Sequence, residues 1–240
     1  MVWHPSPNHG ERRGAVDLLV LHYTGMPTTA GALARLSDPD AQVSAHYLVG
    51  TDGTVWQLVA EHRRAWHAGL ACWRGEHDVN SHSIGVEIAH PGHAFGYRPF
   101  PAAQIAAVQA LCRGIVARHG IPARNVVGHS DVAPNRKEDP GEGFPWPAFA
   151  AAGIGLSPRS CAPLPVPPLV RVQAALAAFG YDLAPNGSCD LATRNAVLAF
   201  QRHFRPACLD GVFDGDCAGR LADLLRQCGC EPAAAGLSIP

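Results

Sequence analysis

The chain has 240 residues, of which 47% are hydrophobic and 16% are charged, and this composition excludes a chain that is disordered throughout. The length exceeds the usual size of one domain, so we expect one large or two unequal domains. Lysine and arginine number 19 against 20 aspartate and glutamate, which leaves no bulk positive charge to hold nucleic acid or an anionic membrane. The uncharged stretches are short and rich in proline, so we expect no transmembrane segment and no nucleic-acid partner.

Four strands are predicted in the first part of the chain. The segment Asp17 to Tyr23 is a short apolar run, typical of a strand buried on both faces. A hairpin follows, in which Ala45 to Val49 and Val55 to Val59 flank a turn that contains glycine. In the next strand, Ile84 to Ala89, apolar residues alternate with others, so Glu87 is predicted to point away from the apolar face.

An amphipathic helix is predicted from Pro101, a residue favoured at the first helical position, to Gly120, which commonly ends a helix. The segment Asn125 to Gly128 is predicted to be a further strand. Because strands and helices alternate, we expect residues 1–157 to form one layered α/β domain.

Residues 158–168 are rich in proline and predict a stiff, extended, poorly packing linker. Beyond it, apolar residues recur at helical spacing and predict a small domain of three short helices over residues 169–240. The motifs Asn186-Gly187-Ser188-Cys189 and Asp214-Gly215-Asp216-Cys217 lie 28 residues apart. They indicate either a repeated helix–loop unit or two unrelated turns.

The eight cysteines are unevenly spaced, and six of them lie in the last third of the chain. Disulfide bonds or small buried thiols are favoured over a zinc cluster, because the close pair Cys228 and Cys230 lacks the two-residue gap of a zinc knuckle. The amino-terminal residues lack the basic start and apolar core of a secretory signal.

Four of the thirteen histidines lie at strand ends or in distinctive motifs: His22, His46, His67 and His129. The loop from Gly128 to Gly141 carries too many polar groups to be a simple connector. Two imidazoles and one carboxylate would give a zinc ion three protein ligands, leaving the fourth position for water. Spacing alone supports such a site weakly, since the sequence has no His-x-x-x-His pair and a His, His, Asp trio is usually structural.

Five segments in a fixed order carry a resemblance to a known family. They are LLVLHYTG, VSAHYLVGTDGTVWQLV, AWHAGLACWRG, NSHSIGVEI and VVGHSDVAPNRKEDPGEGFPW. Over roughly residues 15 to 155 the chain resembles the zinc-dependent N-acetylmuramoyl-L-alanine amidases of the AmpD/AmiD type, themselves similar to peptidoglycan recognition proteins. The resemblance implies an α/β fold with a mixed central β-sheet flanked by helices.

The tail resembles the three-helix peptidoglycan-binding domain through NGSCDLATRNAVLAFQRHF and DGVFDGDCAGRL. It departs from that pattern at Asp214, where glycine is usual, and at Cys217-Ala218, where threonine is usual. These departures make glycan binding by the tail less secure than its fold.

The resemblance assigns His22, His129 and Asp139 as ligands of Zn²⁺, with water as the fourth ligand. Zinc lowers the pKa of bound water towards about 7 and polarises the carbonyl group that it faces. Glu87 matches the glutamate that moves the proton, and Lys137 matches the lysine that faces the developing oxyanion. Without the resemblance, Glu87 would be interpreted as a salt-bridged surface residue and Lys137 as an ordinary exposed lysine.

The resemblance also places a further group of residues along the substrate groove, where aromatic rings stack and polar groups fix orientation. The guanidinium of Arg74 suits the carboxylates of a peptide stem, whereas His46 is also consistent with a buried, hydrogen-bonded histidine and Trp66 with a core residue. The implied substrate-binding residues are His46, Tyr47, Trp66, His67, Arg74 and Asn80.

We therefore expect a zinc amidase that cleaves the bond between N-acetylmuramic acid, in its 1,6-anhydro form or not, and L-alanine of the stem peptide. The expected partner is peptidoglycan or a muropeptide, in cell-wall turnover or recycling. Two alternatives are a non-catalytic recognition protein, which typically loses a metal ligand, and a zinc peptidase acting within the stem peptide. The missing signal favours the cytoplasm. The segment His129 to Trp146, which most resembles the AmiD branch of the family, and the cysteine-rich tail favour the periplasm. The oligomeric state is not predicted.

Overall fold

The computed structural model describes residues 1–159 and 162–237, and within these ranges the strands form one large sheet and one small one. The large sheet has the strand order β1-β5-β4-β7-β3-β8 and is mixed, because β4 and β5 are antiparallel while the other neighbours are parallel. The small sheet pairs β2 with β6. The strands are β1 Val2–Trp3, β2 His9–Glu11, β3 Leu18–Tyr23, β4 Tyr47–Val49, β5 Val55–Gln57, β6 Arg63–Ala65, β7 Ser83–Ile88 and β8 Val126–Gly128.

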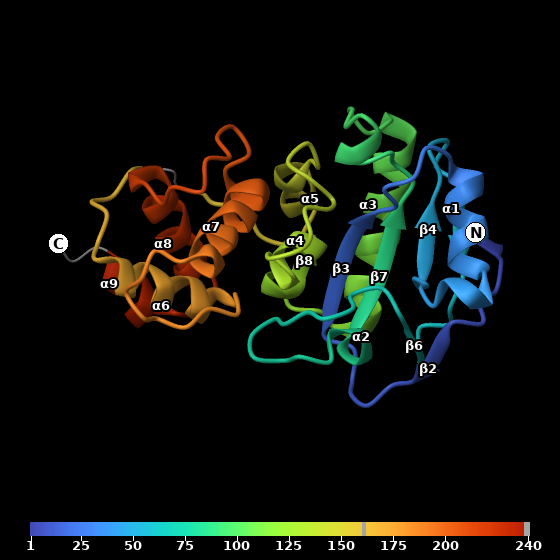
Figure 1. Cartoon of the computed structure of the whole chain (residues 1–240), viewed down its shortest axis with the longest axis horizontal. Helices are drawn as coiled ribbons and strands as arrows, with labels where there is room; N and C mark the ends of the chain where they lie inside the picture. The colour runs from blue at the N-terminus through green and yellow to red at the C-terminus, as the bar shows by residue number, and fades with distance from the viewer. Residues whose placement is uncertain (160–161, 238–240) are drawn as a thin grey trace.

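One face of the large sheet packs against the long helix α3 (Ala102–His119), which lies behind β3 and β7 in Figure 1. Leu21 and Val86 of the sheet share a buried apolar cluster with Val108 and Ile115 of the helix. Gly120 follows α3 with a φ of 63°, a conformation that costs glycine no Cβ clash. The mixed sheet flanked by helices, expected from the sequence, is thus confirmed.

The opposite face is covered at two places and open between them. Helix α1 (Thr29–Ser37) packs over β4, where Leu36 and Leu48 share a cluster. Helix α4 (His129–Val132) follows β8 directly and lies towards the other side (Figure 1). The ends of β3 and β7 therefore form the floor of a groove between α1 and the loop that follows α4.

Residues 169–237, here called the helical region, contain four helices within the described part of the chain, one more than expected. They form the left part of Figure 1 beside α4 and α5 (Trp146–Ala151). The additional helix was missed because its sequence, EPAAAGL, has no apolar period. The four helices are α6 Leu169–Phe179, α7 Leu191–Phe204, α8 Gly215–Gln227 and α9 Glu231–Leu237.

The helical region and the sheet region (residues 1–157) share one buried apolar cluster. Val20 of β3 and Val127 of β8 belong to the same cluster as Phe179 and Phe200 of the helical region. Burial of apolar area is the main favourable term in such packing, at about 25 cal/mol per Å². The helical region is therefore packed against the sheet region rather than held only by a tether.

The segment that connects the two regions has no helix or strand over residues 162–168, in keeping with its prolines. The amide of Leu164 nevertheless donates to the carbonyl of Gly215, and its side chain packs on the shared cluster. The described cysteines are all free thiols, and Cys161 lies outside the described residues.

A structural repeat exists in the helical region, but it relates the loop at Asn186-Gly187 to Asp210-Gly211, 24 residues further on, and not to Asp214-Gly215, which lies 28 residues further on. The buried amide of Gln173 donates to Asn186 and accepts from the amide of Gly187. Gln201 makes the corresponding pair of bonds with Asp210 and Gly211. Each glutamine fixes the loop after its own helix, and an aspartate then caps the next helix.

Short elements complete the chain: α2 Val79–His82 and the 3₁₀ turns Pro39–Ala41, His93–Phe95 and Ala123–Asn125. Among the described residues, none of the helices combines the length and apolar character needed to cross a membrane.

Candidate active site

The floor of the groove comes from two neighbouring parallel strands. His22 in β3 is paired in register with Glu87 in β7, so their side chains project from the same face. Leu19 and Leu21 point to the other face, into the cluster beneath α3. Gly85 precedes Glu87 on the groove face, and a Cβ there would lie 2.4 Å from the His67 ring. Glycine at this position therefore leaves room for the imidazole of His67.

The loop after β8 brings the other two predicted ligands to His22. His129 is the first residue of α4, and Asp139 follows ten residues later. The Nδ1 atoms of His22 and His129 are 2.9 Å apart, and each lies 3.1 Å from Oδ2 of Asp139. All three side chains are buried, and their ligand atoms converge as a metal site requires.

A chain of hydrogen bonds fixes the tautomer of His22. The hydroxyl of Ser83 donates to the carbonyl of Val79, so its oxygen accepts the Nε2 proton of His67. Nδ1 of His67 is then an acceptor and takes the Nε2 proton of His22, 3.0 Å away. This leaves a lone pair on Nδ1 of His22, the atom that faces His129 and Asp139.

The tautomer of His129 is fixed in the same way, because its Nε2 donates to the carbonyl of Ala68 at 3.0 Å. Its Nδ1 atom therefore also presents a lone pair. Burial, and secondly the neighbouring His129, lower the pKa of His22 to about 4, which keeps this imidazole neutral. Two imidazole lone pairs and one carboxylate oxygen meet without a proton to share, and this donor set fits a divalent cation such as zinc.

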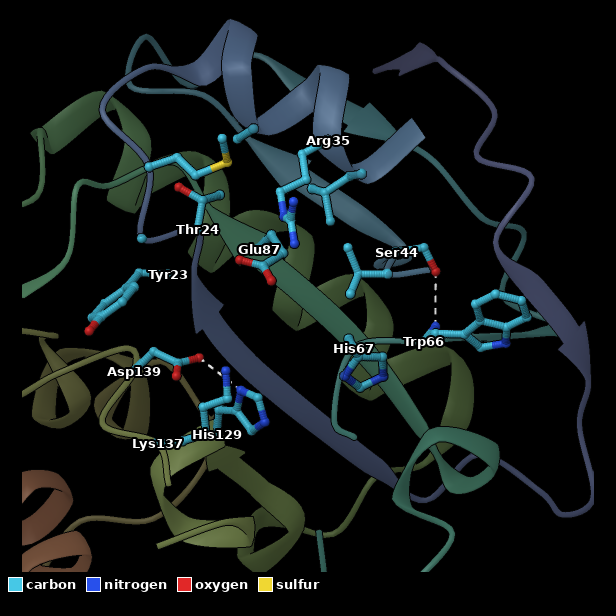
Figure 2. Close-up of a pocket in the computed structure, with 15 residues that line it drawn as sticks. Tyr23, Thr24, Arg35, Ser44, Trp66, His67, Glu87, His129, Lys137 and Asp139 are labelled. Carbon is cyan, nitrogen blue, oxygen red and sulfur yellow. Dashed lines mark hydrogen bonds and ion pairs between the residues drawn. The ribbon is translucent and has the colours of Figure 1, made fainter. Parts of the chain in front are cut away.

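Glu87 projects from β7 into the middle of the groove, between Arg35 and Asp139 (Figure 2). Its Oε2 atom is buried and has no hydrogen-bond partner within the described residues. Burial, and secondly the charge of Asp139, raise the pKa of Glu87 to about 8. A carboxyl group with a buried, unpaired oxygen and a pKa near neutrality is suited to take up and release a proton.

The groove is a cavity of about 290 Å³, and Lys137, Trp66 and His67 line it together with Glu87, His129 and Asp139. Several lining residues were not singled out from the sequence. Arg35 of α1 adds a cation to the wall opposite the loop, and Tyr23, the last residue of β3, lies beside the metal-ligand cluster. Tyr23 was predictable as the neighbour of His22, whereas Arg35 required the position of α1.

Four of the predicted substrate-binding residues do not line this cavity. His46 is fully buried, accepts the Gly85 amide through Nδ1 and lies 2.8 Å from Arg12, so it supports the sheet. Tyr47 is the next residue on the chain and points to the α3 side, where its hydroxyl donates to Glu61. Side chains of consecutive residues in a strand point to opposite faces of the sheet, so Tyr47, which follows His46, points away from the groove.

Neither Arg74 nor Asn80 lies in the groove. The guanidinium of Arg74 lies 3.3 Å from the side-chain oxygen of Asn125, on the side of the helical region. Asn80 is buried, and its side-chain oxygen accepts the amides of His67 and Ala68. Asn80 thus positions the segment that carries His67 and the carbonyl bonded to His129.

The side of α4 that faces away from the groove is bonded to the helical region. Asp131 is buried and accepts from the Gly128 amide, the Tyr181 hydroxyl and Nδ1 of His203, at 2.7 to 2.8 Å. The His203 ring also stacks on Trp146, with ring centroids 3.8 Å apart. The helical region therefore holds the segment that carries His129.

Comparison with known proteins agrees with this geometry. Residues 12–142 match the N-acetylmuramoyl-L-alanine amidase family, and residues 166–221 match a peptidoglycan binding domain. The chain belongs to the N-acetylmuramoyl-L-alanine amidase family and is an amide hydrolase of that kind.

Among individual relatives, the chain is 37% identical to the N-acetylmuramoyl-L-alanine amidase AmiD of Escherichia coli, over 89% of this chain and 84% of AmiD. It is 34% identical to the 1,6-anhydro-N-acetylmuramyl-L-alanine amidase AmpD of Enterobacter cloacae, over 61% of this chain and 87% of AmpD. The match to AmiD extends over both the sheet region and the helical region.

Two solved structures are similar to this chain over most of its length. The E. coli AmiD complex with anhydro-N-acetylmuramic acid-L-Ala-D-gamma-Glu-L-Lys superposes with a TM-score of 0.79 at 34% identity, covering 92% of this chain and 98% of that chain. AmpDh3 of Pseudomonas aeruginosa superposes with a TM-score of 0.81 at 32% identity, covering 93% of this chain and 95% of that chain.

Proposed function

We propose that His22, His129 and Asp139 hold a catalytic zinc ion, and that the enzyme hydrolyses the amide between N-acetylmuramic acid and L-alanine in muropeptides. The observation that carries this proposal is the convergence of two imidazole lone pairs and a carboxylate at separations of 2.9 and 3.1 Å. When bound, zinc supplies a Lewis acid and makes water a better nucleophile near neutral pH.

Glu87 is proposed as the general base and acid of the reaction. Its carboxyl group lines the cavity near Asp139, where it takes a proton from the attacking water and returns it to the departing amide nitrogen. Burial raises the pKa of this carboxyl group above its usual value, which helps it to keep the proton until the amide nitrogen leaves.

Lys137 is proposed to stabilise the negative charge that develops on the carbonyl oxygen. It lines the cavity two residues before Asp139 and on the same wall as His129. A preorganised cation at this position acts mainly in the transition state, so its loss lowers kcat more than it raises KM.

The substrate is proposed to include 1,6-anhydromuropeptides. The solved complexes of AmiD and AmpDh3 contain anhydromuramic peptides, and both proteins match this chain over more than nine tenths of its length. Trp66 and Arg35, which line the cavity on the wall opposite the loop, offer an aromatic face and a cation for the sugar and for a stem carboxylate.

We further propose that residues 1–157 are the zinc amidase domain and residues 169–240 a peptidoglycan-binding domain, joined by residues 158–168. Binding by the second domain would raise the local concentration of wall fragments near the groove. The shared cluster of Val20, Val127, Phe179 and Phe200 supports a fixed orientation of the two. Deletion of the helical region should therefore lower stability as well as activity on intact sacculi.

Mass spectrometry of digested muropeptides tests the proposal directly. Wild-type protein supplied with zinc should release the intact stem peptide from both anhydro and reducing-end muropeptides, and the Glu87→Gln variant should release little. Shortened peptides that are still attached to sugar would instead indicate a peptidase. An unchanged substrate with fully metal-loaded protein would indicate a recognition protein without this activity.

A further inference from the structure

A second group of metal-ligating side chains lies outside the groove, where the sheet region meets the helical region. Cys72 and His77 lie in the loop between β6 and α2, and Asp182 follows α6. One ligand atom from each of the three lies within 4.8 Å of the other two. No sequence pattern indicates this group, because Cys72 stands alone in the chain and Asp182 is more than a hundred residues away.

The separation of the two stronger ligands is close to that of a zinc site. Sγ of Cys72 lies 3.9 Å from Nε2 of His77. Tetrahedral zinc, with S and N at about 2.3 and 2.0 Å, places these two atoms about 3.6 Å apart. A small rotation of the exposed His77 side chain therefore brings both atoms into coordination distance of one ion.

Backbone hydrogen bonds hold the loop in this position independently of any ion. The amide of Cys72 donates to the carbonyl of Val132 in α4, and the amide of Arg74 donates to the carbonyl of Gly180 at the end of α6, both at 2.8 Å. Trp73 between them is buried against Phe179. The cysteine and the segment that carries Asp182 are thus fixed relative to each other before an ion binds, which lowers the cost of binding.

The three side chains border a cavity of about 320 Å³ that shares no lining residue with the groove. Cys72 is buried, whereas His77 and Asp182 are exposed, so an ion can enter from solvent. Burial, and secondly the charge of Asp182, raise the pKa of the Cys72 thiol, and a divalent cation would reverse that effect. Arg136 also borders the cavity, but its guanidinium donates to the carbonyls of Ala68 and Leu70.

We propose that Cys72, His77 and Asp182 form a second metal site, for a divalent transition-metal ion of the zinc class, with solvent in the remaining position. A thiolate, an imidazole and one carboxylate select zinc, cobalt or nickel over magnesium or calcium, which prefer oxygen ligands alone. Cys72 releases its thiol proton to solvent on binding. The ion joins the loop to the helical region and so stabilises the packed arrangement of the two regions.

Titration of the metal-depleted full-length protein with Co²⁺ alone tests this proposal. The groove site has nitrogen and oxygen ligands, so a thiolate-to-cobalt charge-transfer band in the near ultraviolet reports only a site that contains cysteine. We expect two Co²⁺ ions per chain and this band. One ion per chain without the band would overturn the proposal.

Variants then assign the band to this site. Cys72→Ser should abolish it and reduce binding to one ion, whereas Cys189→Ser, at an exposed cysteine, should leave it unchanged. His22→Ala should remove the other ion and keep the band. A band that persists in Cys72→Ser would overturn the proposal.

Two further variants keep the test decisive if Cys72→Ser folds poorly, as its circular dichroism would reveal. His77 and Asp182 are exposed, so His77→Ala and Asp182→Asn should fold normally and weaken Co²⁺ binding at the thiolate site by more than about tenfold. Wild-type affinity in both would contradict the assignment.

Discussion

The segment from His129 to Asp139 has two faces that use the same residue types in opposite ways. On the face towards the helical region, the carboxylate of Asp131 meets three hydrogen-bond donors. On the face towards the groove, the carboxylate of Asp139 meets two imidazole lone pairs, and no proton lies between them. The direction of the hydrogen bonds, rather than the identity of the residues, distinguishes a structural contact from a metal site.

The two faces of the segment from His129 to Asp139 are expected to have different tasks. The groove face should govern metal content and turnover, whereas the Asp131 face should govern stability and the attachment of the helical region. A mutation on one face should therefore leave the properties that the other face governs unchanged.

The largest effect is expected from His129→Ala. Loss of one of three ligands should abolish zinc retention and lower turnover by at least about 10³-fold, while the fold persists. Elemental analysis together with muropeptide assays checks this, with His62→Ala, at an exposed histidine, as the matched control. Stoichiometric zinc in the His129→Ala protein would remove His129 from the ligand set.

Glu87→Gln should retain zinc and lower kcat by about 10²- to 10⁴-fold, because the amide cannot transfer the proton. KM should change little, since a glutamine side chain occupies nearly the same space as glutamate. Near-normal kcat in a zinc-loaded Glu87→Gln protein would show that another group moves the proton.

The same substitution should alter the pH dependence of stability in metal-depleted protein. Folding raises the pKa of Glu87 from 4.5 to about 8, so the native state keeps a proton that the unfolded chain loses, and stability falls as pH rises between these values. Glu87→Gln should remove about 4 kcal/mol of that fall between pH 5 and pH 9. Urea denaturation of the metal-depleted wild-type and Glu87→Gln proteins at pH 5 and pH 9 measures this difference. Parallel profiles of stability against pH would contradict the raised pKa of Glu87.

The smallest effect is expected on the other face of the segment. Tyr181→Phe removes one hydrogen bond to Asp131 and should cost about 1.5 kcal/mol of unfolding free energy, with kcat on soluble muropeptides unchanged. Tyr47→Phe, which also removes a hydroxyl bond but lies on the α3 side of the sheet, away from Asp131 and from the groove, serves as a comparison. A lower kcat at unchanged stability would show that the two faces are not separate.

Sequence patterns predicted the parts of the fold that depend on local periodicity. The buried strand at Leu18–Tyr23 and the helix at Ala102–His119 follow from apolar runs and from the residues that end them. Strands of two or three residues, such as β1 and β6, carry too little pattern to be found and form because they complete a sheet edge.

The metal-ligand cluster was predicted from motifs, but the groups that orient it were not. The path from His22 through His67 and Ser83 to Val79 joins residues whose contact depends on the packing of β3 beside β7. The bond between Asp131 and His203 spans 72 positions and depends on the docking of the helical region. Such contacts have no local sequence signature.

The most direct test of the account is anomalous diffraction at the zinc edge from crystals of catalytically active, zinc-supplied protein. We expect a strong peak bonded to Nδ1 of His22, Nδ1 of His129 and Oδ2 of Asp139, about 2 Å from each. An active crystal form with no peak among these three atoms would contradict the assignment of the groove as a zinc amidase site.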